Sequence, residues 1–250
     1  MSVQGGDDRS SQEGPFERRA ANTVRAIVVA GILCGVVLIG LGSRLAMLLL
    51  RVTSPDSVIG LTSDDDFVIG RFTLAGTYNL LVLGAVFGVI GAGSYRLVAR
   101  WLIGPLWFRR VTVGLASAAV VGSMLVHAKG IDFVVLKPTW LAIGLFVALP
   151  GLFGTFIGSV VDSVERSDSW TAIGRRRWLL PLVGIACFPL TIAPVILVGL
   201  ITMLLTAVGE FDNVRGLRAS LGYSLIVRAF WMVIAVVGLK SLVVDIAALT

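Results

Sequence analysis

Long stretches without a charged residue constrain this chain more than any other feature of its sequence. They span residues 26–43, 72–95, 111–128, 138–161 and 178–209. A helix needs about 20 mostly apolar residues to cross the roughly 30 Å hydrocarbon core of a bilayer, and each stretch reaches or approaches that length. A sixth stretch, 219–244, is apolar but contains Arg228 and Lys240. The pattern therefore predicts six transmembrane helices.

The composition supports this interpretation. Hydrophobic residues make up 56% of the 250 residues, charged residues only 14%, and the mean hydropathy is +0.94. A soluble domain carries about 25% charged residues, so this chain has too few polar side chains to cover a soluble surface. The composition excludes a soluble enzyme, a disordered chain and a small secreted domain held by disulfides. The net charge of +6 fits basic loops beside membrane spans better than a nucleic-acid-binding protein.

We therefore predict an all-α integral membrane protein, a bundle of six transmembrane helices. Residues 1–22 are expected to form a disordered cytoplasmic tail. The helices are expected at about 25–48, 74–96, 111–129, 138–161, 179–207 and 221–243. The first outer loop, 56–74, contains β-prone segments on both sides of a polar turn and predicts a short β-hairpin.

The fifth apolar stretch is longer than one crossing requires. It contains Pro181, Pro189 and Pro194, and proline interrupts helices because it lacks an N–H group and clashes with the preceding turn. We favour a single kinked helix over two separate pieces. A double crossing would move the C-terminus to the other side of the membrane.

Basic residues predict the orientation. The tail and the loops at 96–110 and 162–177 carry more arginine than the loops at 51–71, 129–137 and 210–218. Cytoplasmic loops of membrane proteins are enriched in Lys and Arg. We therefore expect a plasma-membrane protein with a cytoplasmic N-terminus, and six spans then place the C-terminus in the cytoplasm as well.

Polar residues near the outer ends of the predicted helices form the candidate site. They are Arg44, Tyr78, Asn79, His127, Asp132, Lys137 and Arg228. Charged side chains at membrane depth are costly and are often functional. A positively charged pocket in the outer leaflet would suit an anionic group such as a lipid headgroup. The alternative is an ion-pair network that only holds helix ends together.

Glycine pairs at four-residue spacing recur at Gly31/Gly35, Gly84/Gly88 and Gly154/Gly158. Small residues at this spacing let helix backbones approach closely in lipid. Internal packing explains these pairs most simply. A homo-oligomer or a protein partner that contacts these glycine-rich helix faces is the alternative, and membrane lipids are the other expected partners.

Motifs of soluble catalysis and cofactor binding are missing from the sequence. It has no H-E-x-x-H, no G-x-S-x-G, no phosphate-binding loop and no dinucleotide fingerprint. One histidine with two isolated cysteines cannot complete a zinc site, so no metal or cofactor is expected. We favour a non-enzymatic accessory, assembly or lipid-binding module. A transporter or channel for a small or amphiphilic molecule, and a membrane-embedded enzyme acting on a lipid-soluble substrate, remain alternatives.

Three short motifs in this chain are similar to motifs in known sequences. They are Thr53-Ser54-Pro55, the S-D-D-x-F-x-I-G-x-F-T stretch at 63–73, and the D-F-x-x-L-x-P stretch at 132–138. With these motifs the chain resembles a family of uncharacterised multi-pass membrane proteins of high-GC bacteria. The resemblance covers roughly the first 160 residues. It implies a bacterial plasma membrane and no particular activity.

Overall fold

The computed structural model describes residues 15–55, 73–126, 137–166, 168, 169, 171, 174, 176–209 and 221–249. The first apolar stretch forms α1 (Pro15–Cys34), a π-helical segment η1 (Gly35–Leu41) and α2 (Gly42–Thr53). The second forms α3 (Leu74–Val98), which a 3-10 turn η3 (Ala99–Trp101) extends. The remaining elements are α4 (Leu106–Leu125), α6 (Thr139–Glu165), α7 (Arg176–Cys187), η4 (Pro189–Thr191), α8 (Ile192–Gly209) and α10 (Leu221–Leu249).

Two predictions about the ends of the first helix need correction. The predicted β-hairpin at 56–74 is wrong as part of the fold class, because the described residues form helices and contain no strand. Residues 56–72 of that hairpin lie outside the described residues, and Leu74 is already the first residue of α3. The helix α1 begins at Pro15, inside the predicted disordered tail. Proline is favoured in the first turn of a helix, and the alanines and arginines that follow favour helix formation.

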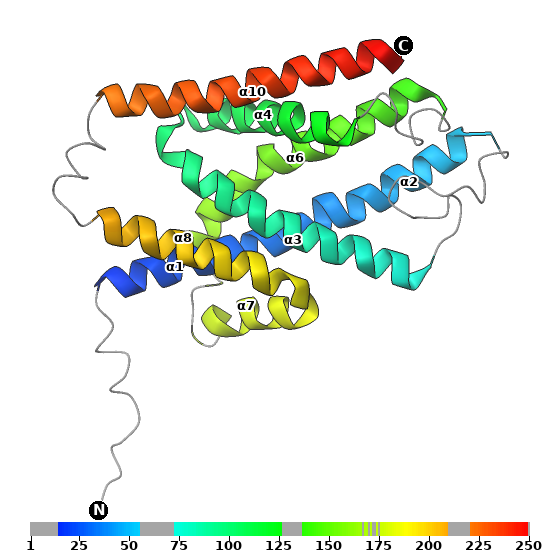
Figure 1. Cartoon of the computed structure of the whole chain (residues 1–250). Coiled ribbons are helices and arrows are strands. Elements are labelled where there is room, and N and C mark those ends of the chain that lie inside the picture. The colour runs from blue at the N-terminus through cyan, green and yellow to red at the C-terminus, as the bar shows by residue number, and fades with distance from the viewer. Residues whose placement is uncertain are drawn as a thin grey trace, which may run out of the picture.

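The helices run between two ends of the bundle (Figure 1). We call them the Arg96 end, where α1 begins and α3 finishes, and the Arg44 end, where α2 finishes and α3 begins. Arg96 Nη2 lies 2.7 Å from Glu165 Oε1, so α6 also finishes at the Arg96 end. At the other end, Arg44 donates a hydrogen bond to the carbonyl of Thr73, and Ser54 donates one to the carbonyl of Lys137, just before α6.

The fifth apolar stretch is not one kinked helix. The axes of α7 and α8 differ by 114° at a break next to Phe188, so they form a helical hairpin. Tyr78 near the start of α3 donates a 2.9 Å hydrogen bond to the carbonyl of Cys187, at the tip of the hairpin. The chain then returns, and Leu205 of α8 lines a cavity together with Arg96. The hairpin therefore begins and finishes at the Arg96 end (Figure 1).

The hairpin reverses the predicted direction of the last helix. Gly238 of α10 packs on Val120 of α4, and Leu242 lies beside Gly122, so α10 and α4 run in parallel. Because α4 starts next to the end of α3, α10 also starts at the Arg96 end. Its C-terminus lies at the Arg44 end, opposite the start of α1 (Figure 1). Among the described residues, five helices are long and apolar enough to cross a membrane alone, and the bent pair would make six if it were one span.

Two of the three glycine pairs, Gly31/Gly35 and Gly84/Gly88, bring α1, η1 and α3 into backbone contact. A Cβ atom added to Gly31 would lie 2.7 Å from the Cα atom of Val89, and one added to Gly88 would overlap the carbonyl oxygen of Gly31. Gly35 and Gly84 meet in the same way. Helices without side chains at the crossing gain van der Waals contact along their backbones. These glycines therefore pack against helices of their own chain and form the core of the bundle.

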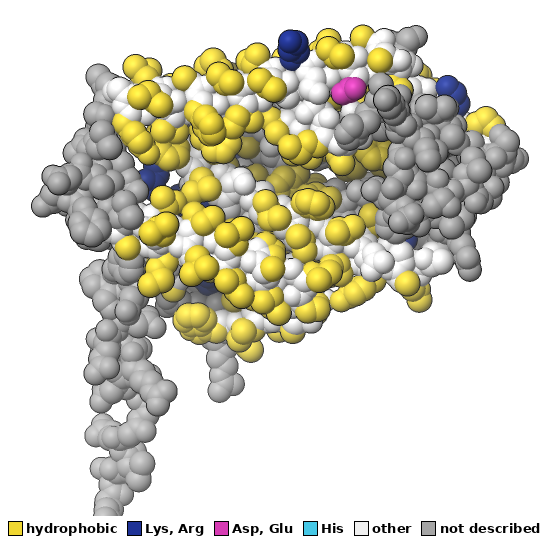
Figure 2. Space-filling model, in the orientation of Figure 1, with side chains coloured by type: hydrophobic (Ala, Val, Ile, Leu, Met, Phe, Trp, Pro, Cys, Tyr) yellow, Lys and Arg dark blue, Asp and Glu magenta, His cyan; other side chains and the backbone are white. Residues whose placement is uncertain are grey.

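The outer surface of the described helices is apolar. Leu45, Leu115, Leu182, Ile226 and many other large hydrophobic side chains are exposed. In Figure 2, yellow hydrophobic side chains cover the visible faces of α10 and α8. A soluble protein rarely exposes apolar patches of this extent. With five helices long and apolar enough to span a bilayer, the described chain has the properties of a multi-pass membrane protein.

Candidate functional site

The structure separates the residues that the sequence placed in one pocket. Arg44, Tyr78, Asn79 and Lys137 lie at or near the Arg44 end, and His127 and Asp132 lie outside the described residues. Arg228 lies at the opposite end, where its Nε donates a 3.2 Å hydrogen bond to the carbonyl of Trp101. Arg228 lies there because α10 starts at the Arg96 end, whereas six crossings predict that this helix starts at the Arg44 end.

Three of the four described residues at the Arg44 end, Arg44, Tyr78 and Lys137, make contacts that hold the fold together. Arg44 bonds to the residue that caps α3, and the backbone of Lys137 exchanges hydrogen bonds with the Ser54 hydroxyl. Tyr78 holds the tip of the hairpin, where its ring stacks 6.4 Å from the ring of Phe188. Asn79 is exposed on α3. None of these residues lines the described cavity.

A cavity of about 270 Å³ lies at the Arg96 end, between α3 and α8 and beside Thr23 and Ile27 of α1 and the first turn of α10. Its walls are mainly apolar, from Ile27, Ile90, Leu97, Leu197 and Ile201. The visible face of the molecule is hollowed between α8 and α10 (Figure 2). Ligand sites are usually apolar hollows with a few polar groups that orient the ligand, and this cavity has that character.

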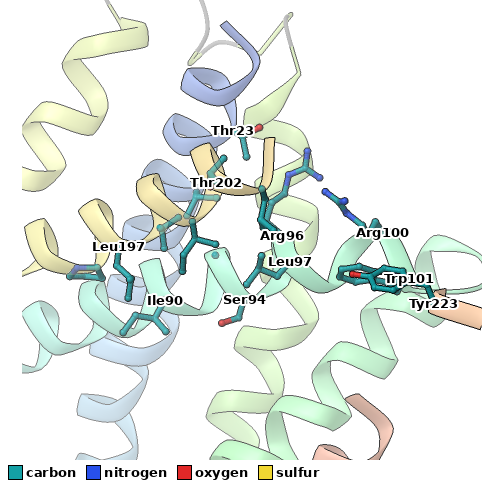
Figure 3. A pocket seen from close by; sticks show the side chains of 16 residues that line it. Thr23, Ile90, Ser94, Arg96, Leu97, Arg100, Trp101, Leu197, Thr202 and Tyr223 are labelled. Carbon is teal, nitrogen blue, oxygen red and sulfur yellow. The ribbon is translucent and has the colours of Figure 1, made fainter. Parts of the chain in front are cut away.

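Polar side chains also line the cavity: Thr23, Ser94, Arg96, Arg100, Trp101, Thr202 and Tyr223. We call the part lined by Arg96, Arg100, Trp101 and Tyr223 its rim. Arg96 and Arg100 are four residues apart, at the end of α3 and in η3, and their side chains extend toward the same rim (Figure 3). The guanidinium carbon of Arg100 lies 5.5 Å from the centre of the Trp101 ring. That ring is also 6.4 Å from the ring of Tyr223, which joins the start of α10 to the same rim.

A network of hydrogen bonds fixes Arg96 from behind. Glu165 Oε1 accepts hydrogen bonds from Arg96 Nη2 at 2.7 Å and from the Thr23 hydroxyl at 3.0 Å. Next to Arg96 on α3, the hydroxyl of Tyr95 donates a 3.2 Å hydrogen bond to Asp162, which lies one turn before Glu165 on α6. These contacts join α1, α3 and α6, so Arg96 extends from a rigid part of the fold.

Arg25, on α1, also binds the end of α6. It is only 6% exposed and donates hydrogen bonds to the carbonyls of Thr171 and Val164, at 2.8 and 3.0 Å. The last carbonyl groups of a helix have no partner within the helix, and a cation there also favours the helix dipole. Arg25 thus holds the end of α6 and the residues after it against α1.

The sequence did not predict this site, because Arg96 and Arg100 lie in a basic loop region that by itself indicates only orientation. The spacing of four residues, which places both arginines on one face of a helix, was the available signal. The other wall is formed by α8, and its return to the same end cannot be read from the sequence. Within the described residues, no group of three or more His, Cys, Asp or Glu side chains could hold a metal ion.

Comparisons with protein-family models, curated proteins and solved structures found no match to this chain. The resemblance to multi-pass proteins of high-GC bacteria therefore stays a prediction.

Proposed function

We propose that this chain is a non-enzymatic multi-pass membrane protein that binds a membrane lipid in the cavity between α3 and α8. The observation that carries the proposal is the pairing of apolar walls with a polar rim at one end of the bundle. A lipid has the same division, with an apolar chain and a polar headgroup. The hollow between α8 and α10 would let the chain enter sideways from the bilayer.

The Arg96 end would face the cytoplasm of a bacterial cell. It carries most of the described basic residues, among them Arg96, Arg100, Arg109, Arg110 and Arg228. The cytoplasmic ends of membrane proteins are rich in Lys and Arg. Trp107 is 65% exposed beside these arginines, and tryptophan is favoured at the level of lipid headgroups. This orientation keeps the N-terminus cytoplasmic and moves the C-terminus outside, because α10 runs away from the Arg96 end.

Photo-crosslinking tests the proposal directly. The protein is reconstituted in vesicles of phosphatidylcholine and phosphatidylglycerol, with a photoactivatable group on the acyl chains of both lipids. We expect crosslinks at the cavity residues Ile90, Leu97 and Ile201 in excess of those at the lipid-facing residue Leu115. Crosslinks no more frequent in the cavity than at Leu115 would refute lipid binding there.

A cavity-filling variant supplies the control. Ser94 is exposed and lines the cavity (Figure 3), so Ser94→Phe should fill part of it and reduce the cavity crosslinks several-fold. Ser163 is also an exposed serine near the Arg96 end, but it does not line the cavity. Ser163→Phe should therefore leave the crosslinks unchanged.

A transporter for an amphiphilic molecule is the second candidate, and the break between α7 and α8 favours it. Transporters often bind substrates where helices are interrupted within the membrane. Here, however, Tyr78 donates to the carbonyl of Cys187 and Thr191 to that of Phe188, which reduces the number of carbonyl oxygens available to a substrate. A vesicle assay separates the candidates: a transporter would speed the movement of a fluorescent lipid between leaflets, and Ser94→Phe would slow it.

A further inference from the structure

We propose that two copies of this chain pair through α10, with Lys240 of each copy bound to Asp245 of the other. The pairing goes beyond the proposed function, because among the described residues of α10 only Tyr223 lines the cavity. Three features of α10 support it: an open apolar stripe, the heptad spacing of that stripe, and two charged residues placed to bind a second copy.

The helix α10 lies along an outer edge of the bundle and packs mainly on α4 (Figure 1). Its buried residues Gly238 and Leu242 face α4. Phe230, Val237 and Val244 lie on another side of the helix and are 59–61% exposed. Residues seven positions apart share nearly the same face of a helix, because seven residues make almost two turns. The described chain therefore leaves an apolar stripe of α10 open.

The open stripe has the spacing of a two-stranded coiled coil. The seam of such a coil uses residues alternately four and three positions apart, the a and d positions of a heptad. From residue 230 onward these positions hold Phe230, Ile234, Val237, Ser241, Val244 and Ala248. None of them is charged, and small side chains such as those of Ser241 and Ala248 let helix backbones approach closely in lipid. The seam would extend over about 27 Å, which nearly matches the roughly 30 Å hydrocarbon core of a bilayer.

Lys240 and Asp245 lie on opposite sides of this seam. Neither has an opposite charge three or four positions away, the spacing at which charges pair along a helix. Among the described residues, neither side chain forms an ion pair or a hydrogen bond. Lys240 lies between Gly238 and Leu242, which pack on α4, so it is level with the apolar part of the bundle. Charged side chains at membrane depth are costly and usually pair with one another.

A second copy supplies the missing partner for each charge. In this heptad Lys240 takes a g position and Asp245 takes the next e position, and residues at e and g form salt bridges between the helices of a parallel coiled coil. Copies of one membrane protein share the same orientation in the bilayer, so α10 would meet α10 in parallel. A two-fold interface makes each contact twice, so the dimer gains two ion pairs, which a low dielectric constant strengthens.

The match is specific to one side of α10. A seam through the exposed Val236 and its heptad neighbours would leave Asp245 on the far side of the helix, so Lys240 would have no carboxylate to bind. In the proposed seam Val233 also takes a g position, seven residues before Lys240. The e residue opposite Val233 is Gly238, which has no side chain, so Val233 stays mainly in contact with lipid.

Cysteine crosslinking in vesicles tests the seam, after both native cysteines are changed to alanine. Single cysteines replace Val237 or Val244 in the seam, and Val236 or Val243 beside it; all four valines are 56–61% exposed. Disulfides form only between residues whose Cα atoms come within about 7 Å. Under mild oxidation with copper phenanthroline, we expect Val237→Cys and Val244→Cys to form linked dimers several-fold more than Val236→Cys and Val243→Cys. Equal crosslinking at all four positions would report random collisions and overturn the seam.

Charge reversal tests the ion pairs. Energy transfer between donor-labelled and acceptor-labelled copies in vesicles gives the dimer Kd as the protein-to-lipid ratio is varied. Lys240→Asp and Asp245→Lys each bring like charges together and should raise this Kd about tenfold. The double variant restores opposite charges and should return the Kd to within about threefold of the unaltered chain. Arg110→Asp reverses an exposed charge outside α10 and should change the Kd less than about twofold. A double variant as weak as the single ones would overturn the pairing.

Neutral variants keep the test decisive if a reversal variant does not fold. Lys240→Gln and Asp245→Asn remove the attraction without adding repulsion, so each should raise the Kd about threefold. If both side chains only extend to the lipid headgroups, neither these variants nor the reversals change the Kd. That result, or a chain that stays monomeric at every protein-to-lipid ratio, would overturn the pairing and leave the stripe to lipid or to a helix of another protein.

Discussion

The helices α1, α3 and α6 pack differently from α10. In the first group, glycine backbones touch, and an arginine, a glutamate and a threonine are hydrogen-bonded across three helices. The last helix packs mainly on α4, and only 11% of its most apolar 18-residue stretch is buried. The tight group of helices therefore fixes Arg96, and the loose contact of α10 leaves the hollow beside the cavity.

The largest expected effect comes from adding a side chain in the tight group. Gly88→Val places methyl groups against the backbone of Gly31, which cannot move aside, so we expect a loss of about 3 kcal/mol or more in the free energy of unfolding. Unfolding in mixed micelles with increasing SDS measures it. Gly144→Val is the matched control, since nothing lies within 4 Å of a Cβ atom there. Similar losses in both variants would contradict the close crossing of α1 and α3.

Arg25→Met tests the polar part of the tight group. The change leaves the carbonyls of Val164 and Thr171 without their buried donor, and we expect a loss of about 2 kcal/mol. The same SDS titration checks it, with the exposed Arg110→Met as control. A stability equal to that of the control would show that Arg25 does not hold the end of α6.

A smaller effect is expected at the tip of the hairpin. Tyr78→Phe removes the hydrogen bond to the carbonyl of Cys187 but keeps the ring beside Phe188, so the cost should be about 1 kcal/mol. Ser163→Ala also removes a hydroxyl group, but one that is exposed and bonds within its own helix, and it should cost less than about 0.5 kcal/mol. Tyr78→Phe should also make the chain easier to cleave by a protease between α7 and α8. Unchanged protease resistance and unchanged stability would contradict the role of Tyr78 in holding the tip.

The smallest effect is expected on the lipid-facing side of α10. Val233 is 60% exposed, so Val233→Ala should change the free energy of unfolding by less than about 0.5 kcal/mol. A loss as large as that of Arg25→Met would mean that α10 is packed against another surface, and the comparison between the two regions would fail.

The sequence predicted the membrane class and the apolar helices because hydrophobic length is a strong local signal. It also predicted that glycines spaced by four would pack closely. It could not predict the break at Phe188 as a reversal, because Pro181, Pro189 and Pro194 fit a kink equally well. That one difference reverses α10 and moves Arg228 from the predicted pocket to the Arg96 end. The cavity could not be predicted either, since it depends on which faces of α3 and α8 meet.

Cysteine accessibility in intact vesicles tests the central claim, that the hairpin of α7 and α8 returns to the end where it began. Single cysteines replace Arg110, Gly222 or Leu249 after Cys34 and Cys187 are changed to alanine, and a membrane-impermeant maleimide labels one side. The structure predicts that positions 110 and 222 are labelled from the same side and position 249 from the other. Labelling of 110 and 249 from one side, with 222 opposite, would restore six crossings and contradict this account.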